Sequence, residues 1–179
     1  MKKILMIVDY QNDFVTGALG FKEAKELDDK IVARVKQAHE NGEMIICTLD
    51  THFTNYLETQ EGRKLPVVHC QVFTNGWDIH GETCRALQDT RYPAATYLEK
   101  NTFGAIGLQN ILKGVTDKNV QIEICGVVTN MCVISNAVMA KSILPEAEII
   151  INSELCAGPD EYLHKAALDV MRSMQMTII

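Results

Sequence analysis

A cysteine follows a glycine-containing apolar run in the stretch ICGVVTNMCVISNA, residues 124–137. A strand that ends near Gly126 or Val127, with Thr129 as a helix N-cap, would place Cys132 in the first turn of a helix. Free backbone N–H groups and the helix dipole lower a thiol's pKa there and favour the thiolate. Because cysteine is also among the most buried residue types, these residues alone leave Cys132 open between a nucleophile and a core side chain.

One carboxylate and two imidazoles fall in a single polar segment. Asp50 and His52 are two residues apart in TLDTHF, and an extended chain puts both side chains on the same side. His69, in LPVVHC, closes the segment. This donor set suits one first-row divalent metal ion, for which we rank zinc first and keep iron and manganese as alternatives. His39, His80 and His164 fall on or beside helical stretches and are interpreted as surface histidines.

Two further polar residues end apolar runs, Asp9 after KILMIV and Lys100 after ATYLE. In a parallel α/β sheet, ligands bind beyond the carboxyl ends of the strands, so both positions are candidates for a site. A solvated loop carboxylate and a surface lysine are the ordinary alternatives, and the residue types alone do not decide between them.

Short apolar runs that alternate with amphipathic stretches must position these residues. The helical pattern is clearest over residues 23–42, and the runs interpreted as strands are KILMIVD, EMIICTL, ATYLEK, VQIEICGVV, EIIIN and MQMTII. Their nearly continuous apolar character indicates strands covered by helices on both faces. We predict an α/β fold, a three-layer α/β/α sandwich around a mainly parallel sheet of about six strands. The polar segment over residues 50–91 lacks sustained periodicity, which is typical of functional segments.

Length and composition favour one domain over residues 1–179 that acts on a small molecule. The chain has 179 residues, 47% of them hydrophobic, and a formal net charge of −6 without a basic stripe, so a nucleic-acid partner is not expected. The N-terminal apolar run is too short for a signal peptide or a membrane span, which predicts a cytoplasmic protein that does not bind membranes. Six cysteines without paired spacing are interpreted as reduced thiols.

The segments DYQNDF, EKNTFGA and CGVVTNMCV, in this order, resemble the cysteine hydrolases of the isochorismatase-like superfamily, over essentially the whole chain. The resemblance implies a catalytic triad of Asp9, Lys100 and Cys132. It also implies a cis peptide between Val127 and Val128, beside backbone N–H groups of Val128 and Cys132 that would hold an oxyanion.

Within that superfamily, the Asp50, His52 and His69 set is similar to the metal ligands of the nicotinamidase (pyrazinamidase) branch. The same resemblance implies that Phe14 and Phe103 line a pyridine pocket and that Glu58 or Glu61 joins the metal. This chain departs from some members in having Leu65-Pro66-Val67-Val68 before the metal histidine where they have a tryptophan, and its only tryptophan, Trp77, comes later.

The implied function is hydrolysis of nicotinamide to nicotinate and ammonia, through a cysteine thioester, in NAD salvage. A cysteine hydrolase for another small amide, such as an N-carbamoyl or ureido compound, is the main alternative. A non-haem iron oxygenase would leave Cys132 unused, and a non-catalytic metal-binding relative would leave the triad unused. Family members are often oligomers, so we expect a homo-oligomer.

Overall fold

Six strands form one parallel sheet in a computed structural model of the chain, which describes residues 1–117 and 119–179. The strand order is β3-β2-β1-β4-β5-β6. The strands are β1 (Lys2–Val8), β2 (Met44–Asp50), β3 (Thr96–Lys100), β4 (Val120–Val127), β5 (Glu148–Ala157) and β6 (Thr177–Ile178). The central strands β1, β2 and β4 are almost entirely buried, as their continuous apolar runs predict.

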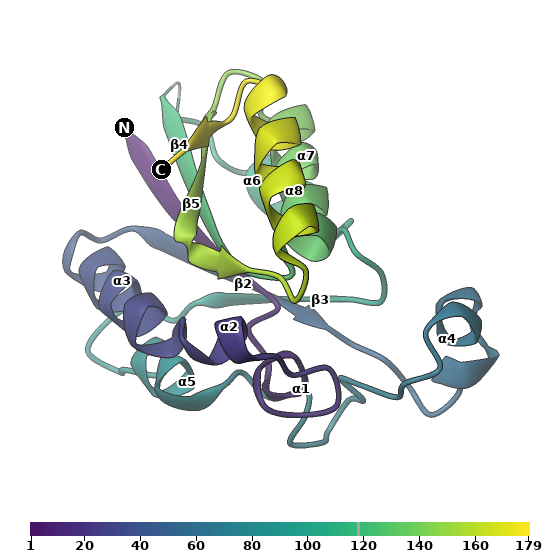
Figure 1. The fold of residues 1–179 in the computed structure, drawn as a ribbon. Coiled ribbons are helices and arrows are strands. Elements are labelled where there is room, and N and C mark those ends of the chain that lie inside the picture. Colours follow the sequence, from purple (N-terminus) through teal and green to yellow (C-terminus); the bar gives the residue numbers. More distant parts are fainter. Residues whose placement is uncertain (118) are drawn as a thin grey trace.

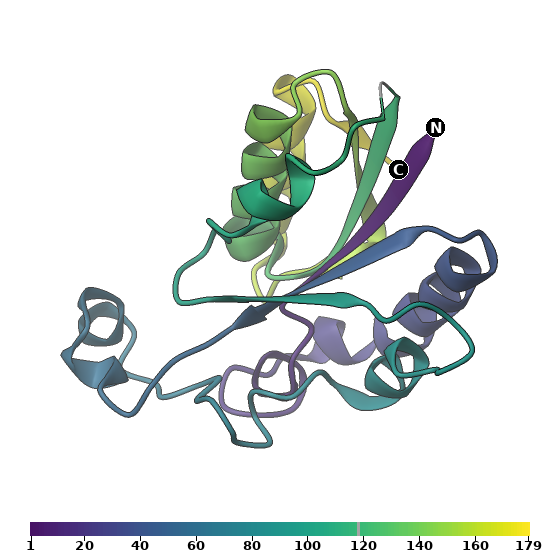
Figure 2. The same ribbon diagram turned by 180° about the vertical axis from the view of Figure 1, so that it is seen from behind.

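Helices cover both faces of this sheet (Figures 1 and 2). One layer contains α1 (Asn12–Val15), α2 (Lys22–Lys25), α3 (Asp28–Glu40) and α5 (Gly81–Leu87). The other contains α6 (Leu108–Leu112), α7 (Ile134–Ile143) and α8 (Glu161–Ser173). The predicted three-layer α/β/α sandwich is therefore confirmed.

A short arm follows β2 in the chain and projects from the body beyond the carboxyl end of that strand (Figures 1 and 2). We define the arm as residues 53–68; it carries the single turn η1 (Tyr56–Glu58) and the helix α4 (Gln60–Lys64). Tyr56 is buried, and its hydroxyl donates a hydrogen bond of 2.9 Å to the carbonyl of Leu65, which closes the arm on itself. Part of the segment over residues 50–91, which the sequence predicts to be irregular, thus forms a compact arm with two short helical turns.

Two predicted boundaries are wrong. The helix predicted over residues 23–42 is divided into α2 and α3, because the N–H of Leu27 turns back to the carbonyl of Ala24, three residues earlier. The same carbonyl accepts a hydrogen bond from the Tyr10 hydroxyl at 2.9 Å, which fixes the break. The strand predicted at MQMTII is limited to β6, because α8 extends to Ser173 and Gln175 adopts a left-handed turn with φ of 67°.

The carboxyl ends of β1 to β4 meet where the strand order reverses, between β1 and β4, which is where ligands bind in open α/β sheets. Gly126 allows the backbones of β4 and β1 to approach each other closely at this point. It pairs with Val8, its φ is +112°, and a Cβ added there would lie 2.1 Å from the carbonyl oxygen of Val8. Within the part of the chain that the structure describes, no helix is long and apolar enough to cross a membrane.

We expect Gly126→Ala to lower the free energy of unfolding by about 3 kcal/mol or more, because it combines backbone strain with a backbone clash. Gly42→Ala is the matched control, since Gly42 also has a positive φ, of +64°, but an added Cβ would meet nothing within 4 Å. Its loss should be about 1 kcal/mol, from the left-handed conformation alone. Urea unfolding measures both; equal losses would contradict the proposed crowding between β1 and β4.

Candidate active site

A buried lysine lies at the centre of the strand ends. The Nζ atom of Lys100, at the end of β3, is 2.7 Å from Asp9 Oδ2 and 3.2 Å from Asp50 Oδ1, and it donates to Cys132 Sγ at 3.5 Å. The alternative interpretation of Lys100 as a surface lysine is therefore excluded, since its side chain is only 2% exposed. Burial alone would lower its pKa, but the negative charge of Asp9 and the nearby Cys132 and Asp50 raise it, so the ammonium form is favoured.

Asp9 is fully buried at the first position after β1, so its alternative interpretation as a solvated loop residue is excluded. It adopts a left-handed conformation with φ of 47°, which is uncommon for a residue other than glycine and turns the chain into the site. Thr48 in β2 donates a hydrogen bond of 2.6 Å from Oγ1 to Asp9 Oδ1. Burial raises the pKa of Asp9 despite the opposing charge of Lys100. The sequence analysis missed Thr48, whose only signal was a hydroxyl inside an apolar strand.

Cys132 lies in the first turn after β4, as predicted. The turn is a π-helical segment, η2 (Thr129–Val133), that continues directly into α7. Thr129 is not its N-cap, because Val128 occupies that position and the Thr129 hydroxyl instead bonds His164 Nδ1 at 2.8 Å. The expected lowering of the thiol pKa is also wrong. Burial, followed by the charge of Asp9, raises the pKa of Cys132 well above its ordinary value, so the group rests as a thiol.

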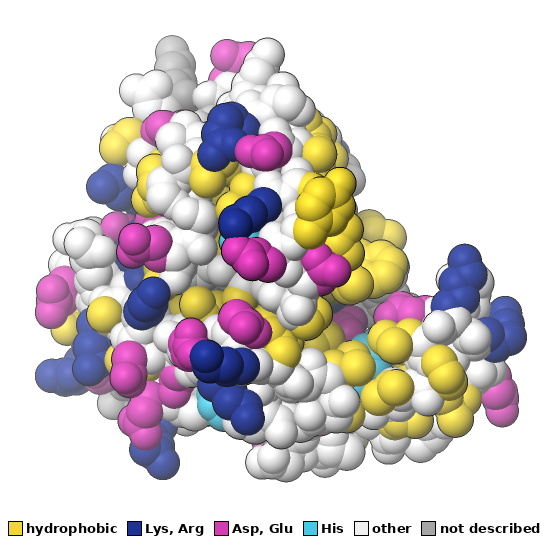
Figure 3. All heavy atoms as spheres, in the orientation of Figure 1, with side chains coloured by type: hydrophobic (Ala, Val, Ile, Leu, Met, Phe, Trp, Pro, Cys, Tyr) yellow, Lys and Arg dark blue, Asp and Glu magenta, His cyan; other side chains and the backbone are white. Residues whose placement is uncertain are grey.

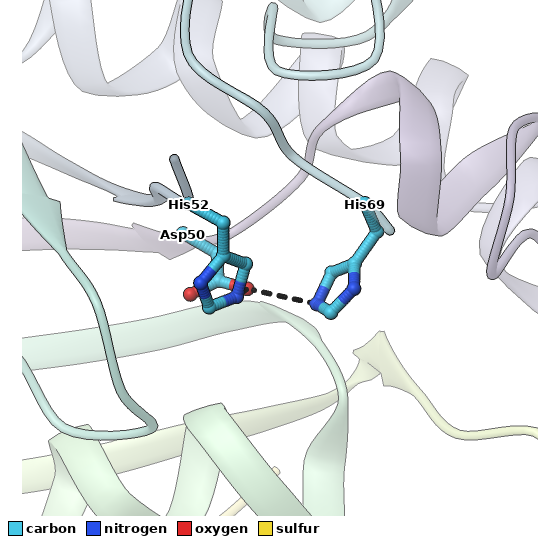
Figure 4. A group of neighbouring side chains, drawn as sticks. All are labelled: Asp50, His52 and His69. Carbon is cyan, nitrogen blue, oxygen red and sulfur yellow. Dashed lines mark hydrogen bonds and ion pairs between the residues drawn. The ribbon is translucent and has the colours of Figure 1, made fainter. Parts of the chain in front are cut away.

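Asp50, His52 and His69 come together at the edge of this cluster (Figure 4). Their ligand atoms lie within 4.8 Å of one another, and all three residues are buried. Asp50 Oδ2 is 3.1 Å from His52 Nε2 and 3.4 Å from His69 Nε2. Burial would raise the pKa of Asp50, but hydrogen bonds from both imidazoles and the charge of Lys100 outweigh it and hold the pKa below its usual range.

The donor chemistry fits a divalent cation. Two carboxylates, those of Asp9 and Asp50, face one ammonium group, so the cluster keeps a negative charge that a cation would balance. His69 Nδ1 lies 2.8 Å from the carbonyl of Val67, so Nε2, which faces Asp50, is the His69 nitrogen that would serve as a ligand atom. Of the two glutamates considered as further ligands, Glu61 places Oε1 3.8 Å from His52 Nε2, whereas Glu58 is exposed on η1.

The loop after β1 holds the backbone of this cluster. Gln11 is fully buried; its Oε1 accepts from the N–H of Asp50 at 2.8 Å, and its Nε2 donates to the Asp50 carbonyl at 2.9 Å. Asp13 Oδ2 accepts from the N–H of Cys70, next to His69, at 2.7 Å. Sequence reasoning missed both roles, although both residues stand in the quoted segment DYQNDF.

A cavity of about 180 Å³ opens beside Cys132. Phe14, Phe103, Leu65 and Met131 contribute apolar walls, and Asp50, Glu61 and His69 contribute the polar end. The predicted pocket residues Phe14 and Phe103 are therefore brought together with Val128 and Cys132. Figure 3 shows hydrophobic side chains on both sides of the recess between the arm and the layer of α7 and α8. The site can hold a small, flat, mainly apolar molecule with its reacting atom against the thiol.

A larger groove of about 580 Å³ lies between α5 and the edge of β2 and β3. Trp77, Arg85 and Tyr97 are among the residues that line it. Among the described residues that form this groove, none is a predicted site residue, so we place the chemistry in the smaller cavity.

Two other predictions concern single features. The Val127–Val128 peptide bond is cis, at the position that the family resemblance implies. His39 is not a surface histidine, because it is buried in α3 and its ring stacks on Tyr92 at 4.6 Å between centroids. His80 and His164 are half-buried and lie outside the metal-type cluster.

The same fold and much of the same sequence pattern occur in known proteins. A sequence model of the isochorismatase domain family matches residues 3–179. A Bacillus subtilis protein named as an uncharacterized isochorismatase family protein, PncA, is 27% identical over 173 residues, which is 94% of this chain and 93% of that protein.

Solved structures agree with the family match. The nicotinamidase/pyrazinamidase PncA from Bacillus subtilis has a TM-score of 0.88 at 25% identity, and the match covers 99% of both chains. The pyrazinamidase of Pyrococcus horikoshii in complex with zinc has a TM-score of 0.82 at 26% identity, covering 100% of this chain and 99% of that chain. With a family match over nearly its whole length and the same fold in these structures, this chain belongs to the isochorismatase domain family, as one of its hydrolases.

Proposed function

We propose that this protein hydrolyses nicotinamide to nicotinate and ammonia through a thioester on Cys132. The observation that carries the proposal is the position of Lys100 Nζ, which contacts Asp9, Asp50 and Cys132 at once. A buried ammonium group joins an acid, a thiol and a metal-type cluster beside one small cavity, which Cys132 and Asp50 line. If these residues had separate structural roles, they would not need to lie around one ammonium group.

Asp9 acts as the general base for Cys132. Burial raises the pKa of the thiol and the pKa of the carboxyl group, while the ammonium group of Lys100 favours the ionised form of Asp9, so Asp9 can accept the proton that the thiol gives up. The proton therefore moves from Sγ to Asp9 as sulfur attacks the carboxamide carbon. The C–N bond then breaks, ammonia leaves with that proton, and a water molecule activated by Asp9 cleaves the thioester to release the acid.

Lys100 and the backbone stabilise the charges that develop. The ammonium group orients the Asp9 carboxylate at 2.7 Å and lies near the sulfur. Val128 and Cys132 both line the cavity, and their N–H groups are assigned to the oxyanion, at about 3 kcal/mol of transition-state stabilisation for each donor.

The ring of the substrate is held at the other end of the cavity. Phe14 and Phe103 provide aromatic walls, and Asp50, His52 and His69 would hold one divalent cation, zinc ranked first, with Glu61 favoured over Glu58 as a further ligand. When bound, the cation supplies Lewis-acid attraction for a ring nitrogen, which fixes the orientation of the carboxamide.

The solved relatives support this proposal. One is described as a nicotinamidase/pyrazinamidase and another as a pyrazinamidase in complex with zinc, at 25% and 26% identity. A single domain over residues 1–179, a cytoplasmic location, a homo-oligomeric state and the lack of nucleic-acid and membrane partners stay predictions.

The direct test is a panel of nicotinamide, pyrazinamide, benzamide and an N-carbamoyl amino acid, with ammonia release measured and metal quantified in the same preparation. We expect the two pyridine-type amides to be preferred. Cys132→Ala should lower their turnover at least about a thousandfold while circular dichroism stays unchanged.

Cys84→Ser is the matched control, because Cys84 is half-exposed in the groove beside α5 and should not affect turnover. Preferred release from the carbamoyl compound would replace nicotinamide by the alternative substrate class. Retained turnover in Cys132→Ala would remove the nucleophile from the mechanism.

His52→Ala should remove most of the bound metal, because the cluster loses one of its buried ligands. Metal analysis after gel filtration measures the content, and the KM for nicotinamide should rise. His80→Gln, outside the cluster, is expected to keep its metal. Equal metal content in both variants would show that the cluster is not the metal site.

Glu61→Gln and Glu58→Gln form a second matched pair. Glu61 is 3.8 Å from His52 and lines the cavity, so we expect its substitution to weaken metal affinity by about tenfold to a hundredfold. The Glu58 variant should bind metal as the parent protein does. Chelator competition gives both dissociation constants, and the reverse ranking would assign the further ligand to Glu58.

A further inference from the structure

We propose that Asn136 is a positioning residue that sets the shape of the substrate cavity, and thereby its preference for flat aromatic amides. The inference rests on the proposed function for its substrate but on separate contacts for its geometry. Asn136 lies in the first turn of α7, one turn after Cys132, and is fully buried. It belongs to neither the triad nor the metal-type cluster.

The carboxamide of Asn136 makes three hydrogen bonds to backbone groups. Its Oδ1 accepts from the N–H of Ala105 at 2.9 Å. Its Nδ2 donates to the carbonyl of Phe103 at 3.1 Å and to the carbonyl of Cys132 at 2.8 Å. One side chain thus connects the nucleophile's backbone to the loop that follows β3, with both of its polar atoms satisfied.

That loop carries one wall of the cavity. Phe103 lines the same cavity as Cys132, although this residue is 46% exposed and receives limited support from packing. The neighbouring Gly104 lies so close to α7 that an added Cβ would be 2.5 Å from Met139 Sδ. The loop backbone is therefore fixed against α7 on both sides of Gly104, by Asn136 and by this contact, and the fixed backbone sets the position of the Phe103 ring.

The consequence concerns selectivity. A flat aromatic amide needs the Phe103 ring at the correct distance from the thiol, whereas a small aliphatic reagent reaches Cys132 without contacting that ring. Loss of the Asn136 contacts should therefore weaken productive binding of aromatic substrates more than it changes the reactivity of the thiol.

The test measures cysteine alkylation and turnover in parallel. In a Cys84→Ser background, rates of Cys132 alkylation are measured with iodoacetamide and with its N-phenyl derivative, and the rate of a Cys132→Ala blank is subtracted. In Asn136→Ala, the ratio of the N-phenyl rate to the iodoacetamide rate should fall about tenfold, and KM for nicotinamide should rise by a similar factor with a smaller change in kcat.

Asn136→Asp keeps an acceptor for Ala105 and loses both donated bonds, so it should shift the ratio in the same direction by a smaller factor. Asn152→Ala is the matched control, because the Asn152 amide donates to Glu123 at 3.0 Å, away from the cavity, and its ratio should not change. An unchanged ratio in a folded Asn136 variant overturns the proposal. So does the failure of both Asn136 variants to fold, which would assign the residue a role in stability alone.

The proposed function and this inference fail separately. If the parent protein does not hydrolyse nicotinamide, the function is wrong, but the alkylation ratio still measures whether Asn136 positions the Phe103 wall.

Discussion

The ammonium group of Lys100 is the interaction on which the site depends. It is buried between Asp9 and Asp50, at 2.7 and 3.2 Å, and it also reaches the sulfur of Cys132. Without this charge, two carboxylates would lie buried side by side at the strand ends. The loss of hydration and the repulsion between them would raise their pKa values and favour protonation of one of them. With it, one carboxylate is oriented toward the thiol, and the remaining negative charge lies beside His52 and His69, where a cation can balance it.

The ends of β1, β2, β3 and β4 each contribute one site residue, and a few buried amide and hydroxyl groups hold these residues in place. Thr48 bonds Asp9, Gln11 bonds the backbone of Asp50, and Asn136 bonds the backbone of Cys132 and of the loop after β3. These bonds satisfy polar groups that burial would otherwise leave unpaired. The precision of the site therefore comes from a surrounding polar network as much as from the sheet itself.

The structure also changes the explanation of how the thiol becomes reactive. A position at the start of a helix favours the thiolate in solvent, but burial and the carboxylate of Asp9 act in the opposite direction and raise the pKa of Cys132. In the proposed mechanism, reactivity therefore depends on Asp9 as a base beside the thiol rather than on a thiolate that exists in advance. For the proposed substrate, the same burial that disfavours the charged thiol would also exclude water from the carboxamide and strengthen its interactions with nearby donors.

The sequence by itself determined the layered α/β fold, the residues at the strand ends and the family, because apolar runs and motif residues are local signals. It misplaced three local features: the break at Leu27, the end of α8 and the N-cap of the cysteine turn. The first and the last depend on tertiary hydrogen bonds made by Tyr10 and His164, and the end of α8 depends on the left-handed backbone angle of Gln175. Only the tertiary structure decided the raised pKa of Cys132, the position of Glu61 beside His52, and the contacts of Asn136. These depend on burial and on distances between residues far apart in the chain, which no local pattern encodes.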